Sequence, residues 1–177
     1  MKSKAFTLIE IIIVITIIGI ITAIAILSYR GAYERQQVSV FSKDLLATAQ
    51  HAKSAVKSGK KDDAGLLCEG IYFVTGEIPQ KISMNYVEGA CAFPGELSNL
   101  DQSSTNILVN SINLADSITL LFVPPSGSGL VYDSNNQLLS GAPIVEFAHV
   151  NYSDLNFNFG VDLDTDRIYI EKKDEEN

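Results

Sequence analysis

The sequence predicts an α+β protein in which one long N-terminal helix packs on an antiparallel β-sheet head. Three observations predict this fold class. Residues 6–27 form an apolar run with a single ionisable side chain. Apolar residues then continue at helical spacing as far as Ser58. From Leu66 onward they fall instead in short alternating runs separated by turn residues, which is typical of strands.

The length, charge and cysteine content of the chain indicate which classes of function do not suit it. A chain of 177 residues suits one modest domain with an attached element. Its formal net charge is −8, and no run of Lys or Arg interleaves with aromatic residues, so we expect no direct nucleic-acid partner. Cys68 and Cys91 lie outside any CxxC pair of the kind that indicates zinc or redox chemistry. They are either one disulfide in an exported chain or two unpaired small core residues.

The apolar run is predicted to be a membrane-spanning helix. Residues 1–5 precede it as a short polar stretch whose only charged side chains are Lys2 and Lys4. Residues 6–27 span about 33 Å as an α-helix, enough to cross a hydrocarbon core of about 30 Å. Lysines before the span and an acidic chain after it orient the N-terminus toward the cytoplasm and the rest of the chain outward.

Glu10 is the one ionisable residue of the predicted span. A carboxylate inside an apolar helix costs about 2.5–3.5 kcal/mol on insertion scales, so it needs a partner. Glu10 lies one helical turn from Phe6, where a positive group of a neighbouring subunit can meet it when helices pack side by side. Alternatively, Glu10 snorkels to the membrane edge and the segment is a plain anchor or signal peptide. Residues 28–30 lead into more helix, whereas a secretory signal places a polar cleavage region there.

Residues 4–10, which read Lys-Ala-Phe-Thr-Leu-Ile-Glu before an Ile-rich helix, resemble the prepilin signature of type IV pilins and type II secretion pseudopilins. In that family a membrane prepilin peptidase cuts before the Phe and methylates its new amine, and the Glu aids assembly. The resemblance therefore implies cleavage between Ala5 and Phe6, N-methylation of Phe6, and pairing of Glu10 with a Phe6 amine. It also implies four kinds of partner: prepilin peptidase, other pilin or pseudopilin subunits, inner-membrane assembly machinery, and membrane lipid before assembly.

Two departures from the family pattern favour a minor pilin or pseudopilin over an abundant major pilin. The family usually has Gly before the cut, and this chain has Ala5. Major pilins often carry a helix-loosening Pro late in the span, where residues 23–26 are only Ala and Ile. The implied location is a single-pass inner-membrane protein with a cytoplasmic N-terminus and an extracytoplasmic head, and then a cell-surface or periplasmic filament.

Residues 28–58 are predicted to continue the helix as an amphipathic segment that ends at Ser58-Gly59. The opposite face is polar and includes Arg35, Lys43 and Lys53. The predicted apolar face consists of Tyr29, Tyr33, Val38, Phe41, Leu45, Ala49, Ala52 and Val56.

Residues 66–171 are predicted to form the β-rich head, with a loop over residues 96–106 and a charged tail at residues 172–177. Turns are expected at residues 124–129, 134–137 and 164–166, where Pro, Gly, Asn and Asp gather. The predicted strands are residues 71–74, 82–87, 107–109, 117–123, 129–132, 144–150, 155–163 and 167–171.

The order of one helix and then strands is similar to the head of minor pilins and pseudopilins. A disulfide between Cys68 and Cys91 would then clip the first β-hairpin to its surroundings and contribute about 3 kcal/mol. The predicted function is a structural filament subunit. The alternative is a membrane-anchored protein whose head binds a ligand or a surface.

No enzyme activity and no cofactor are expected, because the sequence offers no nucleophile and base. His51 falls on the amphipathic helix and His149 on a strand, so both are predicted to be ordinary structural or surface residues. Asp162, Asp164 and Asp166 alternate like a calcium loop, but Arg167 and Lys173 stand where its Gly and Glu belong. A charged hairpin turn is the preferred interpretation, with calcium as the alternative.

Overall fold

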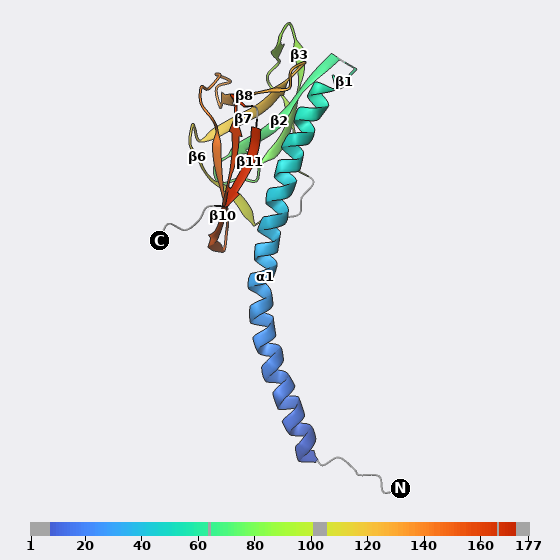
Figure 1. Ribbon diagram of the computed structural model, residues 1–177, viewed down its shortest axis with the longest axis vertical. Helices are drawn as coiled ribbons and strands as arrows, with labels where there is room; N and C mark the ends of the chain where they lie inside the picture. The colour runs from blue at the N-terminus through green and yellow to red at the C-terminus, as the bar shows by residue number, and fades with distance from the viewer. Residues whose placement is uncertain (1–7, 64, 101–105, 166, 173–177) are drawn as a thin grey trace. The chain divides into compact units, whose positions relative to one another are not determined.

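The computed structural model describes residues 8–63, 65–100, 106–165 and 167–172. Helix α1 is Leu8–Lys57, and the chain divides into two compact units, Met1–Gln37 and Val38–Asn177. Figure 1 shows the helix and the strands that follow it. The strands are β1 (Lys61–Asp62), β2 (Gly65–Val74), β3 (Gln80–Val87), β4 (Ala90–Cys91), β5 (Glu96–Asn99), β6 (Ile107–Ile112), β7 (Ser117–Val123), β8 (Ser128–Asp133), β9 (Ile144–His149), β10 (Tyr152–Asp162) and β11 (Arg167–Lys172).

The strands of the second unit form two antiparallel sheets. The larger sheet has the order β4-β3-β2-β7-β8, with β1 paired to β2 and β5 paired to β3. The smaller sheet has the order β11-β10-β9-β6. The predicted fold class, a long helix on an antiparallel β-rich head, is confirmed, and each of the eight predicted strands coincides with an observed one.

The core of the head lies between the two sheets and the last part of α1. Phe41 of the helix packs against Phe147 and Phe157 of the smaller sheet, with ring centroids 5.7 and 6.2 Å apart. Phe73 of the larger sheet meets Phe147 and Phe159, at 6.1 and 5.6 Å. These phenylalanines therefore join all three layers, because each layer contributes at least one ring.

The helix ends through hydrogen bonds that a glycine permits. Gly59 has a φ of 73°, a left-handed conformation that side chains disfavour. Its N–H donates to the carbonyl of Val56, and the N–H of Lys60 donates to that of Ala55, each at 3.0 Å. This pair of bonds is a Schellman motif, which satisfies carbonyls that the helix end would leave open. The predicted stop at Ser58-Gly59 is therefore one residue from the observed end at Lys57.

Helical spacing predicted the buried stripe correctly only from Val38 onward. Phe41, Leu45, Ala49, Ala52 and Val56 are buried, and Val38 is partly buried against them. Tyr29 and Tyr33 were expected on the same face, but they are 69% and 48% exposed. The spacing identifies a common face, whereas burial depends on where the sheets begin to cover it.

Three short strands lie where the sequence indicated loops or gave no signal. Residues 96–106 were predicted to be a loop, yet Glu96–Asn99 form β5, which pairs with β3 from Gln80 to Ser83. The charged loop after the helix contains β1, and Ala90–Cys91 form β4 against the end of β3. Their backbone pairing with stable neighbours outweighs a composition that disfavours strands.

A substitution at Phe41 measures how much the helix contributes to the stability of the head. Replacing Phe41, which is 1% exposed, with Ala removes the ring between helix and sheet and should lower the free energy of unfolding by about 3–5 kcal/mol. Urea denaturation of the full chain in detergent micelles measures it.

Val40→Ala is the matched control, because Val40 is on the same helical turn but 49% exposed. It should change the free energy of unfolding by less than about 0.5 kcal/mol. Equal losses for the two variants would contradict the assigned core.

Candidate functional site

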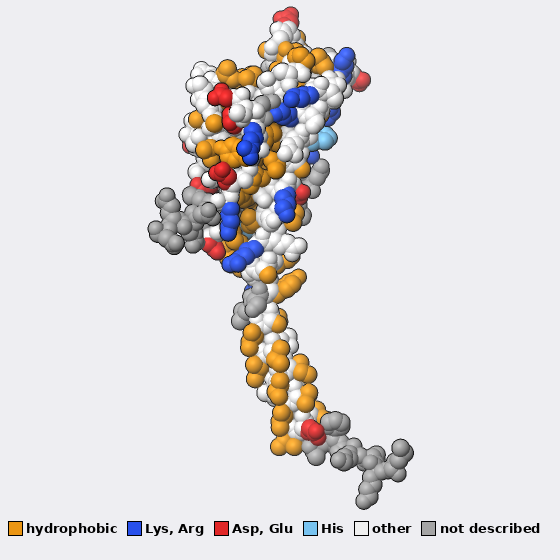
Figure 2. Space-filling view, viewed as in Figure 1, with side chains coloured by type: hydrophobic (Ala, Val, Ile, Leu, Met, Phe, Trp, Pro, Cys, Tyr) orange, Lys and Arg blue, Asp and Glu red, His pale blue; other side chains and the backbone are white. Residues whose placement is uncertain are grey.

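The first half of α1 presents an apolar surface that nothing in the described structure covers. Among the described residues, one helix is long and apolar enough to cross a membrane, and none of its most apolar window is buried. Figure 2 shows hydrophobic side chains covering this part of the chain. Large exposed residues here are Leu8, Ile9, Ile11, Ile12, Ile13, Val14, Ile15, Ile17, Ile18, Ile20, Ile21, Ile24 and Ile26.

The two threonines of this segment form hydrogen bonds within the helix itself. The Thr16 hydroxyl donates to the carbonyl of Ile12 at 2.8 Å, and the Thr22 hydroxyl donates to that of Ile18 at 2.7 Å. A group that is hydrogen-bonded inside its own helix can enter an apolar environment at little cost. The segment is therefore chemically suited to lipid or to a bundle of apolar helices.

Glu10 lies in the first turn of α1, with its side chain exposed. Within the described residues no hydrogen bond or ion pair engages it. Carboxylates near a helix N-terminus are favoured by the exposed backbone N–H groups there. The predicted cleavage between Ala5 and Phe6 and the N-methylation of Phe6 lie outside the described residues, so the pairing of Glu10 with a Phe6 amine stays a prediction.

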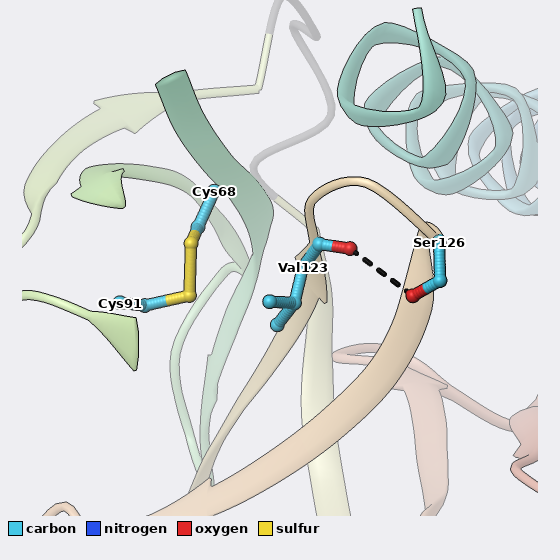
Figure 3. Close-up of a disulfide and its surroundings, with 4 residues drawn as sticks. All are labelled: Cys68, Cys91, Val123 and Ser126. Carbon is cyan, nitrogen blue, oxygen red and sulfur yellow. Dashed lines mark hydrogen bonds between the residues drawn. A yellow bond between two sulfur atoms is a disulfide. The ribbon is translucent and has the colours of Figure 1, made fainter. Parts of the chain in front are cut away.

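Cys68 and Cys91 are joined as a disulfide in the head (Figure 3). Cys68 lies on β2 and Cys91 on β4, which pairs only with the end of β3. The bond fixes this short strand to the middle of the larger sheet, beside the turn in which the Ser126 hydroxyl donates to the carbonyl of Val123. Both cysteines belong to a second buried cluster, with Ile82, Met84 and Leu121.

Of the aspartates in the alternative calcium interpretation, Asp162 is the last residue of β10 and Asp164 lies in the turn that follows it. One carboxylate oxygen of Asp162 accepts the N–H groups of Asp164 and Thr165 at 3.0 and 3.1 Å. The Thr165 hydroxyl and these two N–H groups hold the pKa of Asp162 below its usual value. Asp166 lies outside the described residues, and no group of three His, Cys, Asp or Glu side chains among the described ones is placed to hold a metal ion.

The two histidines lie apart from one another. His51 is exposed on α1, whereas His149 is buried on β9 and its Nδ1 accepts the N–H of Asn151 at 3.2 Å. They lie on different elements of the fold, α1 and β9.

A group that sequence reasoning missed lies on the face of the larger sheet that carries the disulfide. Tyr72, Phe93 and Thr119 line a small cavity there, from three separate segments of the chain. The alternation in β2 between Ile71, Tyr72 and Phe73 was a signal that Tyr72 faces away from the core. Nothing in the sequence indicated which segments would meet it.

The structure has a pilin-like architecture: one long, apolar N-terminal helix packed on antiparallel sheets. The family model described as the prokaryotic N-terminal methylation motif matches residues 1–26. Two curated relatives, both called fimbrial protein and both from Pseudomonas aeruginosa, are 45% identical over 58 residues. That match covers 33% of this chain and 38% of each relative. No solved structure gave a significant match.

The chain therefore carries the methylation motif at residues 1–26 and is similar to fimbrial proteins over 58 residues. The match covers well under half of each relative's length.

The disulfide should carry a measurable part of the head's stability. Replacing both Cys68 and Cys91 with Ala opens a loop with a sequence separation of 23 and should lower the free energy of unfolding by about 3 kcal/mol. Denaturation of the full chain in micelles, with and without a reductant, measures this. The reductant should lower the free energy of unfolding of the wild type and leave that of the double variant unchanged. Two results would refute the bond: a wild type whose stability does not respond to the reductant, or free thiols in peptide maps of exported protein.

Proposed function

We propose that this chain is a minor subunit of a type IV pilus-like or pseudopilus filament. In this proposal prepilin peptidase processes it, and its apolar N-terminal helix assembles it into the filament. The observation that carries the proposal is the exposed apolar surface of residues 8–26, joined to a methylation motif that spans residues 1–26. Burying apolar surface is worth about 25 cal/mol per Å², so this helix demands either lipid or partners.

In this proposal the helix lies first in the membrane and later among the helices of other subunits. Before assembly the helix crosses the inner membrane, with Lys2 and Lys4 on the cytoplasmic side and the head outside. During assembly it leaves the lipid and packs against the apolar helices of other subunits. The Cys68–Cys91 bond supports an extracytoplasmic head, because disulfides persist in oxidising compartments.

In this proposal, Glu10 determines the register in which the helices of neighbouring subunits pack. A buried carboxylate without a partner is costly, so subunits that meet with Glu10 beside a positive group are favoured over other registers. The N-methylated amine of Phe6 in a neighbouring subunit is the proposed positive group, because cleavage creates it one helical turn from the carboxylate.

A minor role rests on the particular residues of this chain. Ala5 precedes the proposed cut in place of the usual Gly, and no Pro loosens the span. The disulfide ties β4 to β2 near the start of the head, whereas in many major pilins it brackets a C-terminal loop. A membrane-anchored binding protein is the second candidate, and the cavity beside Tyr72, on the face of the larger sheet that carries the disulfide, favours it.

Processing can be read directly from the mature N-terminus. In cells that contain prepilin peptidase, intact-mass and peptide mass spectrometry should find a chain that begins with methylated Phe6. Cells that lack the peptidase are the control, and their product should retain Met1. An intact Met1 in the peptidase-containing cells would overturn the proposal.

Glu10 can be tested separately from membrane insertion. Glu10→Gln and Glu10→Ala should insert normally, because each removes a charge from an apolar helix, but should reduce incorporation into filaments by about tenfold or more by leaving the Phe6 amine unpaired. Quantitative immunoblotting of sheared filaments against membrane fractions measures the ratio.

Glu171→Ala is the matched control, since it removes an exposed carboxylate from β11 in the head. It should leave incorporation unchanged. Normal incorporation of both Glu10 variants would remove the role assigned to this carboxylate.

A further inference from the structure

The larger sheet of the head has two faces with different neighbours. In β2, Ile71 and Phe73 point into the main core with the end of α1. Tyr72 lies between them and points to the opposite face, which we call the outer face. Thr119 of β7 is its direct cross-strand partner, so both side chains belong to the outer face.

A groove of about 190 Å³ lies on this outer face above Tyr72 and Thr119. Its lining also includes Phe93 and Pro94, from the segment that follows β4, and residues of the turn that follows β8, namely Asp133, Ser134 and Asn136. This volume is below the range of about 300–1,000 Å³ usual for drug-sized ligands, so the groove suits one small ring or one unit of a larger chain molecule.

The aromatic wall of the groove is the ring of Phe93, which a ring contact and the nearby disulfide hold in place. The ring of Phe93 meets the ring of Tyr132 edge-on, with centroids 5.1 Å apart and an angle of 69° between their planes. The segment that carries Phe93 begins directly after Cys91, which the disulfide ties to Cys68. A prearranged aromatic surface loses little conformational entropy when it binds a ligand.

The groove lining includes the hydroxyl of Thr119. Thr119 is 5% exposed as a residue, but its hydroxyl is not among the buried side-chain atoms that lack a partner in the described part of the chain. The hydroxyl can therefore donate a hydrogen bond to, or accept one from, a molecule in the groove. Ser134 and Asn136 add a hydroxyl and an amide at the exposed rim.

Asp133 supplies a fixed negative charge at the same edge. One of its oxygens accepts the N–H groups of Asn135 and Gln137, each at 2.8 Å. The Gln137 N–H contributes most to holding the pKa of Asp133 below its usual value, and the Asn135 N–H adds to this. The carboxylate therefore stays ionised near neutral pH and is anchored by its own turn.

We propose that this groove binds a neutral sugar, with one pyranose ring stacked on the aromatic wall. A pyranose has an apolar face of C–H groups, which suits Tyr72 and Phe93, and a rim of hydroxyls, which suits Thr119, Asn136 and Asp133. The described residues that line the groove include no Lys or Arg, and the whole chain carries a net charge of −8, so an anionic ligand is disfavoured. This site does not depend on filament assembly, since it lies in the head alone.

The test uses the full chain in a polyoxyethylene detergent, because alkyl-glycoside detergents would occupy a sugar site. Saturation-transfer-difference NMR is recorded with methyl glycosides of glucose, galactose, mannose and N-acetylglucosamine. At least one should receive saturation mainly at the C–H protons of one ring face. Choline at the same concentration tests the rival cationic ligand, which an aromatic site beside a carboxylate could also attract.

Variants connect the signal to the groove. Tyr72→Ala should weaken sugar binding by about tenfold or more, and Thr119→Val should weaken it to a smaller extent. Tyr72→Phe, which keeps the ring, should retain most of the binding. Circular dichroism melting of each variant establishes that the head is folded.

Tyr152→Ala is the matched control, because Tyr152 lies on β10 of the other sheet. It should leave sugar binding unchanged. Absence of saturation transfer to all four glycosides, a stronger response from choline, or an equal loss in Tyr152→Ala would overturn the proposal. None of these results bears on N-terminal processing, so failure of this site and failure of the filament function are distinguishable.

Discussion

The structure depends on an apolar helical surface that the chain leaves uncovered. From Leu8 to Ile26 the side chains of α1 are exposed, and Glu10 is the only ionisable group among them. No folded protein keeps such a surface in water, so its cover must come from lipid or from the same surface of other molecules. The head must consequently fold without using this part of the helix, and the buried cluster does begin only at Val38.

The surroundings of the helix side chains change partway along its length. Up to Gln37 it belongs to one compact unit, and from Val38 onward it belongs to the head, where Phe41 fits against Phe147 and Phe157. Phe147 and Phe157 stack almost in parallel, with ring centroids 4.9 Å apart, and the Phe41 ring is tilted by 60° and 57° to them. A single regular helix can do both tasks because its two parts present apolar surface to different neighbours.

The sequence was sufficient where a local pattern decides the structure. Regular spacing predicted the stripe from Phe41 to Val56, and alternation predicted the principal strands. It failed where distant partners decide: Tyr29 and Tyr33 have the right spacing but nothing covering them, and the polar strand β5 exists because β3 pairs with it. The outer groove was beyond prediction for the same reason, since β2, β7 and two separate turns must meet to build it.

The two faces of the larger sheet contribute to different parts of the head. Its inner face, with Ile71 and Phe73, is used for the core that joins the helix to both sheets. On its outer face, Tyr72 packs against the smaller cluster around the disulfide, which is separate from the cluster that contains Phe41. Among the described residues, the groove lining and helix α1 have no residue in common. If the proposed functions hold, a substitution in the groove would therefore change ligand binding without changing the apolar surface of the helix.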